Sequence, residues 1–333
     1  MESIKHIITS GCSFTRQEHR LGFNGTDTDF LKDAFQYWRW PHHIQTEYEN
    51  YKVYNLGNPT NDNGVIAHSA IKKISDLLKE GISPNDIKVI IQWSEQGRNS
   101  FFISNQVAQD FGGLAKDRHE NDRYDVNRWS HLAAFAEKDH FKERFGYYLL
   151  TGNYYPTSHI EYPTELIELH AKYYSHQESA IRFFTNIILL QNFCKVNNIN
   201  ELFMFNLSYN FFIDKEPNIF ETVEQVYIDK KIPSYKTNFT TTNPYISYLY
   251  ESIDFDKIWF YEDKNTNVGG QLEWAVANFD YKTDKRLCME HDYVETDLHD
   301  YCNTFPSDNP VGHVSSEMNR KFVKVILKEF LEK

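Results

Sequence analysis

Residues 4–15 of the chain read IKHIITSGCSFT, a short β-branched run that stops at a serine-glycine pair. Ile4–Thr9 has the length and composition of a strand, and Ser10-Gly11 bounds it as a turn. A serine in the turn after a strand, here Ser13, presents its hydroxyl at the carboxyl edge of a parallel sheet, where ligands bind in open α/β folds. This turn is therefore a candidate functional site, although Ser13 could also simply cap the first helix.

Two further runs indicate that the first strand belongs to a parallel sheet. Lys52–Asn55 (KVYN) and Ile87–Gln92 (IKVIIQ) predict a second and a third strand. Between them lies a helix with one apolar face, which Asp62 or Asn63 can cap. The continuous apolar run of the third strand suits a buried parallel sheet, and the strand-helix-strand order allows right-handed crossovers.

The rest of the chain adds elements of the same kind. Glu178–Asn197 predicts an apolar helix, Glu201–Leu207 a fourth strand, and Ser315–Glu332 an amphipathic helix with Ser315 as its N-cap. Residues 210–300 show no regular pattern, and we expect them to be irregular and to extend the face that carries the site. Together these elements predict a three-layer α/β fold with a parallel central sheet.

A long insertion interrupts this pattern. Between residues 99 and 177 the sequence is rich in His, Asp, Tyr and Asn and shows only short helical pieces. A structureless loop of this length is improbable in a compact domain, so we expect an inserted subdomain or lid. The predicted core then consists of residues 1–98 and 178–333.

The composition excludes several classes of function. With 35 Lys+Arg against 47 Asp+Glu among 333 residues, the formal net charge is −12, which disfavours a general nucleic-acid binder. No uncharged apolar run reaches the roughly 18 residues of a membrane-spanning helix. The first residues lack the apolar core of a signal peptide, and the four cysteines are scattered without a CxxC pair. We therefore expect a cytoplasmic protein with reduced thiols that binds no membrane.

Metal and nucleotide cofactors are not expected either. His42-His43, His291-Asp292 and the acidic stretch around His299 offer ligand types, but their spacing fits no common metal motif. Neither the phosphate-binding pattern GxxxxGK nor the dinucleotide pattern GxGxxG occurs in the chain.

Four segments resemble, in the correct order, the sequence blocks of the SGNH (GDSL-type) hydrolase family, in the variants common in tailed-phage genomes. Gly11–Thr15 (GCSFT) resembles the first block, and Asn55–Asn63 (NLGNPTNDN) the second. Trp93–Gln96 (WSEQ) stands where the family has its third block, and Gly312–Ser315 (GHVS) where it has its catalytic histidine. The resemblance implies a flavodoxin-like α/β/α fold and, for a viral protein, association with the virion.

The resemblance implies the chemistry of a serine esterase. Ser13 stands at the nucleophile position, next to Cys12 where the family usually has Asp, and His313 stands at the position of the general base. The family places its acid three residues before the histidine, where this chain has Pro310. Asp308, five residues before the histidine, is then the candidate carboxylate that orients the imidazole.

An oxyanion hole is implied by the same blocks. The N–H of Ser13 is one donor. The second-block glycine of the family aligns with Thr60, near Gly57, and the third-block asparagine aligns with Gln96, with Ser94 as the other candidate. The implied substrate is an acylated small molecule or glycan, with an O-acetyl or similar acyl group on a carbohydrate as the first choice.

Other interpretations stay open at this point. An acyltransferase would use the same triad with a sugar hydroxyl as acceptor. A non-catalytic module that binds glycan or protein on a decayed SGNH scaffold would account for Pro310 and the altered third block. His313 could be a surface-loop histidine, Trp93 a buried anchor instead of a substrate contact, and Arg98 an ion-paired structural group instead of an anion clamp.

Overall fold

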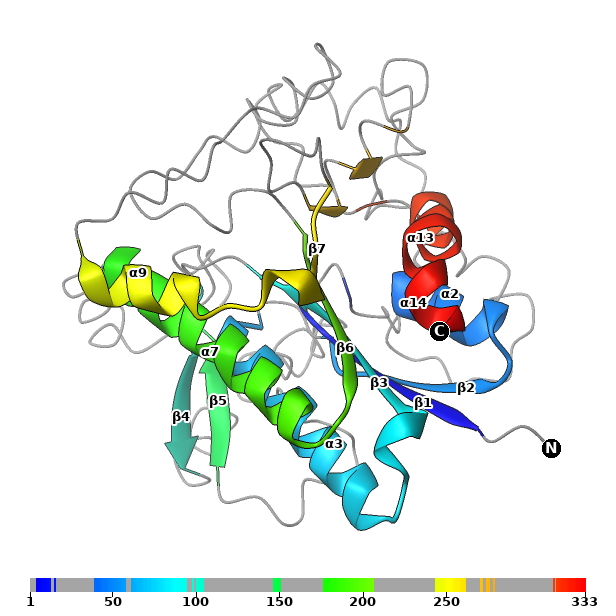
Figure 1. Cartoon of the computed structure of the whole chain (residues 1–333), viewed down its shortest axis with the longest axis horizontal. Helices are drawn as coiled ribbons and strands as arrows, with labels where there is room; N and C mark the ends of the chain where they lie inside the picture. Colours follow the sequence, from blue (N-terminus) through cyan, green and yellow to red (C-terminus); the bar gives the residue numbers. More distant parts are fainter. Residues whose placement is uncertain are drawn as a thin grey trace, which may run out of the picture.

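A computed structural model of the chain contains a five-stranded parallel sheet with helices on both faces (Figure 1). The structure describes residues 4–12, 15, 39–57, 61–94, 98, 100–104, 146–150, 176–206, 243–261, 270–271, 274–275, 278, 314 and 316–333, with the backbone alone for 100–104, 146–150 and 176. The strands lie in the order β2 (Tyr51–Asn55), β1 (Lys5–Ser10), β3 (Ile87–Trp93), β6 (Asn200–Phe205) and β7 (Ile258–Trp259).

The order of the strands reverses at β1. From β1 the chain moves outward to β2, returns to β3 on the other side of β1, and then continues outward to β6 and β7. Every neighbouring pair in this sheet is parallel. Such a reversal leaves a crevice outside the carboxyl ends of the two central strands, which is where ligands bind in open α/β sheets. In this sheet the corresponding position lies beyond the carboxyl ends of β1 and β3.

Burial on both faces explains the apolar strands. All seven residues of β3 are buried, and their side chains alternate between the two faces, as the strand period of two requires. Val89 and Ile91 join the core on one face, whereas Ile90 joins the core on the other. A strand with both faces covered has no solvent side, so its sequence reads as a continuous apolar run.

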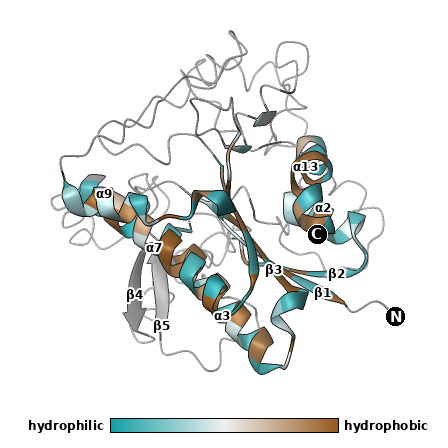
Figure 2. Cartoon of the chain, viewed as in Figure 1, coloured by the Kyte–Doolittle hydropathy of each residue, from teal (hydrophilic) through white to brown (hydrophobic). Residues whose placement is uncertain are grey.

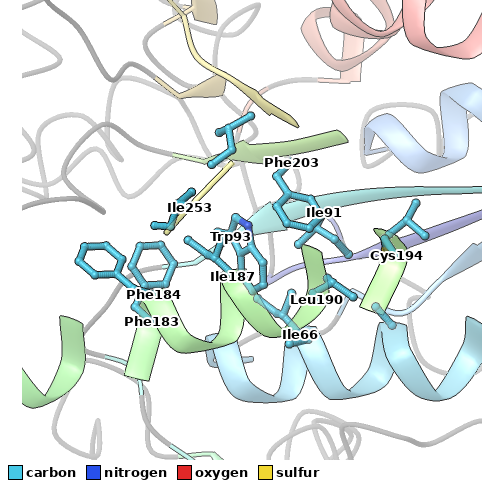
Figure 3. Packing of buried hydrophobic residues seen from close by; sticks show 14 of the residues in the cluster. Ile66, Ile91, Trp93, Phe183, Phe184, Ile187, Leu190, Cys194, Phe203 and Ile253 are labelled. Atoms are coloured by element: carbon cyan, nitrogen blue, oxygen red, sulfur yellow. The ribbon is translucent and has the colours of Figure 1, made fainter. Parts of the chain in front are cut away.

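Three helices cover the first face of the sheet: α3 (Asn63–Lys79), α7 (His176–Val196) and α9 (Pro244–Glu251). The helices alternate hydrophobic and hydrophilic positions along their length (Figure 2). Asp62 caps α3 by accepting a hydrogen bond from the Val65 N–H at 2.8 Å. The core under these helices gathers aromatic and aliphatic side chains from β3, β6 and α7 (Figure 3).

The opposite face is covered by α2 (Trp40–Glu47) and by the C-terminal helical segment. That segment consists of α13 (Ser316–Phe322), a π-helical stretch (Val323–Leu327) and α14 (Lys328–Glu332). Its end is held to the sheet by Lys88, whose buried ammonium donates to the carbonyls of Phe330 and Leu331, each at 2.7 Å. Tyr51 donates a further hydrogen bond to the carbonyl of Leu331.

Most of the predicted elements are confirmed within one or two residues, and two expectations are corrected. Residues 210–300 are not wholly irregular, because they contain α9 and the edge strand β7. β7 has two residues, too few to produce a periodic pattern. The C-terminal helix contains a π-helical stretch that periodicity does not reveal, and its predicted cap, Ser315, lies outside the described residues.

Within the predicted insertion, β4 (Ser100–Ser104) and β5 (Gly146–Leu150) pair as an antiparallel two-stranded sheet of their own. This pairing joins two segments at the start and in the second half of residues 99–177. Among the helices that the structure describes, none has the length and apolar character needed to cross a bilayer.

Stability below neutral pH should depend on His43, which is buried between α2 and α13 and lies 3.0 Å from the Ser316 hydroxyl. Burial, assisted by nearby His42 and Arg320, lowers the pKa of His43 from 6.5 to about 4. Between these values the unfolded chain binds a proton that the folded chain does not. The free energy of unfolding should therefore fall as the pH drops from 6.5 to 4, by about 3 kcal/mol from this group.

Urea unfolding at several pH values checks this expectation. His43→Gln should flatten the dependence of stability on pH in this window, because glutamine does not titrate. His68→Gln, at an exposed position of α3, is the control and should keep the slope of the wild type. An unchanged slope in His43→Gln would contradict the assignment.

Candidate active site at the carboxyl edge of the sheet

The turn after β1 is fixed at the crevice by hydrogen bonds to both neighbouring strands. Thr15 N donates to the Cys12 carbonyl at 3.0 Å and closes the turn. The Thr15 hydroxyl donates to Gln92 Oε1 on β3 at 2.8 Å, and Asn55 Nδ2 on β2 donates to the Thr15 carbonyl at 2.9 Å. The two ends of the turn that contains residue 13 are thereby anchored, although Ser13 itself lies outside the described residues.

Gly11 is required in this turn because of packing. A Cβ atom at this position would lie 2.1 Å from Thr15 Oγ1 and 2.9 Å from the Gln92 carbonyl oxygen. The latter is a backbone atom of the central strand and cannot retreat easily. Any larger residue would push the turn away from β3, so the glycine brings the turn close to the sheet.

The segment before α3 reaches the same turn. Asn61 Nδ2 donates to the Gly11 carbonyl at 3.0 Å, and the Asn61 side chain is fully buried. Asp62 is occupied as the helix cap. The approach of α3 to the end of β1 is therefore held by a side-chain amide that binds backbone.

The end of β3 is bound to the start of α3 in a reciprocal pair. Ser94 N donates to Asn63 Oδ1 at 2.9 Å, and Asn63 Nδ2 donates to the Ser94 carbonyl at 3.2 Å. Among the residues that the structure describes, the buried Ser94 hydroxyl and the buried Asn61 Oδ1 have no hydrogen-bond partner. Buried polar atoms without a partner are uncommon in proteins, and a catalytic role is one of several explanations for them.

Aromatic packing of the preceding residue, Trp93, sets the position of Ser94. Trp93 is fully buried and contacts Phe203 and Phe183 in edge-to-face geometry, with ring centroids 5.4 and 6.1 Å apart (Figure 3). This confirms the interpretation of Trp93 as a buried anchor. Its large ring fixes the end of β3 in the core under α3 and α7, and Ser94 directly follows it.

Cys12 lies two residues after the end of β1, at the carboxyl edge of the sheet. Its side chain is fully buried, and Asn206, which follows β6, has its Nδ2 3.7 Å from the Cys12 sulfur. A carboxylate at this position would require strong compensation after losing its water. The Cys12 thiol and the Asn206 carboxamide are buried together at this edge of the sheet.

Several predicted site residues cannot be compared with the structure. Ser13, Thr60, Gln96, His313 and Asp308 lie outside the described residues. Two others are described. Ser94 stands at the end of β3 as the sequence order requires, and its hydroxyl is buried.

Gly57, the other predicted donor, has its N–H engaged in the structure. It donates to Asn55 Oδ1 at 2.9 Å. A backbone N–H has one proton to donate, so this bond competes directly with any oxyanion. Thr60 is then the remaining second-block candidate for the predicted oxyanion hole.

Sequence reasoning missed the side-chain amides that assemble the site, namely Asn61, Asn63, Gln92, Gln271 and Asn319. Gln92 offered a signal, because it ends an otherwise apolar run in a strand predicted to be buried. A polar side chain there needs a partner, and that partner comes from elsewhere in the chain. Which residues bond to Gln92 depends on tertiary packing, and no local pattern indicates Gln271 or Asn319.

Comparison of the chain with protein-family models, with curated proteins and with solved structures gives no significant match. Among the described residues, no group of three or more His, Cys, Asp or Glu side chains could hold a metal ion. The geometry of the crevice and the order of the sequence blocks are therefore the basis for a functional proposal.

A single methyl group should test the tight turn. Gly11→Ala should lower the free energy of unfolding by about 1–3 kcal/mol, because the added Cβ overlaps Thr15 and the β3 backbone. The matched control is Gly64→Ala in α3, where the nearest atom would be 3.5 Å away. Alanine favours a helix over glycine, so this variant should be neutral or more stable by up to about 1 kcal/mol. Equal effects in urea unfolding would contradict the packing argument.

Proposed function

We propose that the chain is a serine esterase of the SGNH type, which hydrolyses an O-acetyl or similar acyl group on a carbohydrate. When the five sheet strands are numbered along the chain, their order in the sheet is 2-1-3-4-5. This order supports the flavodoxin-like fold that an SGNH-type enzyme would have. It is the order of flavodoxin-like doubly wound sheets, which bind ligands at the β1/β3 switch point. The preference for a carbohydrate ester rests on the resemblance of the sequence blocks alone.

The observation that carries the proposal is the meeting of three of the four blocks at one edge of the sheet. The first and second blocks touch through the bond from Asn61 to Gly11, across 50 residues of sequence. The second and third touch through the pair Asn63–Ser94, across 31 residues. The parallel order of β2, β1 and β3 brings the three segments to one edge, and the side chains of Asn61 and Asn63 bond them together there.

In the proposed reaction, Ser13 Oγ attacks the ester carbonyl while His313 accepts the hydroxyl proton. The tetrahedral intermediate collapses, the C–O bond to the sugar breaks, and His313 returns the proton to the departing sugar oxygen. Water then attacks the acyl-enzyme with His313 as base, which releases the carboxylic acid and free Ser13. Asp308 orients the imidazole. Transfer to a sugar hydroxyl would replace only the water.

The oxyanion is held in this proposal by N–H groups of Ser13 and Thr60 and by a side-chain donor from the third block. The Ser94 hydroxyl suits that third role because it is buried and carries no other described hydrogen bond. A donor that is already free of partners needs no bond broken when charge develops on the substrate. Gln96 is the alternative donor.

Covalent labelling with a fluorophosphonate probe tests the nucleophile and the base. An activated serine attacks the phosphorus atom and expels fluoride, which leaves a stable serine phosphonate ester. Wild-type protein should be labelled, and both Ser13→Ala and His313→Ala should abolish labelling. Ser252→Ala, at the exposed C-cap of α9, and His68→Ala, at an exposed position of α3, are the controls and should be labelled at the wild-type rate. Folded wild type that stays unlabelled would refute the esterase proposal and favour the non-catalytic binding module.

The third-block donor can be assigned by two further variants. Ser94→Ala removes a buried hydroxyl that bonds to no described residue, so stability should stay the same or rise. Its labelling rate should fall by about 10²–10³-fold if the hydroxyl stabilises the developing oxyanion. Gln96→Ala is the comparison. A normal rate in Ser94→Ala with a slow rate in Gln96→Ala would move the role to Gln96.

A further inference from the structure

A continuous chain of hydrogen bonds joins the turn after β1 to the start of the last helix. The Thr15 hydroxyl donates to Gln92 Oε1 at 2.8 Å, and Gln92 Nε2 donates to Gln271 Oε1 at 2.7 Å. Gln271 Nε2 donates to Asn319 Oδ1 at 2.9 Å, and Asn319 Nδ2 donates to the Val314 carbonyl at 2.9 Å. We call these five residues the amide relay.

The direction of the amide relay is fixed at both ends. The Trp40 indole N–H, which can only donate, also binds Gln92 Oε1, at 3.2 Å. The Val314 carbonyl, which can only accept, binds Asn319 at the other end. A side-chain amide presents one oxygen and one nitrogen, so the donor-only and acceptor-only ends leave one orientation for all three amides between them. Reversing any one of them would set donor against donor.

Burial makes the amide relay cooperative. All five members are almost completely inaccessible to solvent: the polar residues Thr15, Gln92, Gln271 and Asn319, and also Val314. Water does not readily replace a lost partner in such a buried place, so removing Gln271 takes one acceptor from Gln92 Nε2 and one donor from Asn319 Oδ1. The relay therefore behaves as one unit that connects distant parts of the chain.

The ends of the amide relay adjoin the two residues on which the proposed reaction depends. Thr15 comes two residues after Ser13, and Val314 directly follows His313. We propose that the amide relay holds the segment of the general base against the turn of the nucleophile, with Gln271 as its positioning residue. This inference rests on the proposed function, because a register between these two segments matters for catalysis only if they carry the reacting groups.

Gln271 is the link that connects otherwise separate layers. Gln92 belongs to the sheet and Asn319 to α13, and Gln271 bonds to both while belonging to neither. Without it, the bond between Asn319 and Val314 would still hold the start of α13 locally, but the hydrogen-bonded connection from Asn319 to Gln92 would be lost. A small displacement of a catalytic group is enough to cost about 10²-fold in rate.

Gln271→Met is the test, because methionine keeps the approximate volume and removes both hydrogen bonds. Gln191→Met is the matched control: Gln191 is a buried glutamine of α7 that also makes two hydrogen bonds, to the N–H and carbonyl of Asp254 at 3.0 and 2.7 Å. Both variants should lower the urea midpoint similarly. Fluorophosphonate labelling is then measured over a range of probe concentrations, to separate the maximal inactivation rate from the probe concentration at half-maximal rate.

The expected result is specific to the amide relay. Gln271→Met should lower the maximal inactivation rate by about 10²-fold, with little change in the half-saturating probe concentration, whereas Gln191→Met should keep both values. Asn319→Leu breaks the next link and should reproduce the loss, which covers the case that Gln271→Met does not fold. Labelled wild type with normal rates in the relay variants overturns this inference alone. Unlabelled wild type overturns the proposed function and this inference together.

Discussion

The carboxamide of Gln92 constrains the whole carboxyl edge of the sheet, because it is a polar group at the end of a strand buried on both faces. It accepts from Thr15 and Trp40 and donates to Gln271. An unpaired buried amide costs about 1–3 kcal/mol for each group left without a partner. The turn after β1, the start of α2 and the segment around residue 271 must therefore all approach this one side chain. Their convergence shapes the edge at which the strand order reverses.

Close approach of backbone to backbone is the second requirement at this edge. The glycine at position 11 lets the turn lie against β3, and the asparagines at 61 and 63 bind backbone groups of the turn and of Ser94. Side-chain amides suit this task because each offers a donor and an acceptor on a short, rigid arm. The result is a neutral polar layer above an aromatic core, in which a developing charge would meet oriented dipoles and little water.

The two faces of the sheet contribute differently to this edge. The face covered by α3 and α7 holds aromatic side chains that set the end of β3 by packing. The face covered by α2 and the C-terminal helical segment holds the polar connections, including the amide relay and the contact of His43 with Ser316. Packing thus sets where the strand ends, and hydrogen bonding sets which loops meet there. The two effects are separable because side chains of one strand alternate between the faces.

Local patterns in the sequence were sufficient for the parallel α/β architecture. Strands such as β3 and helices such as α3 were predicted within a residue or two, since periodicity and capping act over a few neighbouring residues. The edge strand β7 and the helix α9 were not predicted. β7 has only two residues, which are too few to show a periodic pattern. The four sequence blocks were identified from their order along the chain, and the structure brings the first three to one edge of the sheet. Ser13, Asp308, Thr60, Gln96 and His313 remain predictions from that order.

Local sequence patterns thus predict the class of fold and the turn at which a functional group is expected. The tertiary structure alone decided that Gln92, Gln271 and Asn319 join into one chain, and that the N–H of Gly57 is already engaged. The two kinds of interaction act over different separations along the chain. Strand and helix patterns follow from neighbours along the backbone, whereas the partner of a buried amide is whichever group the packed fold brings within about 3 Å.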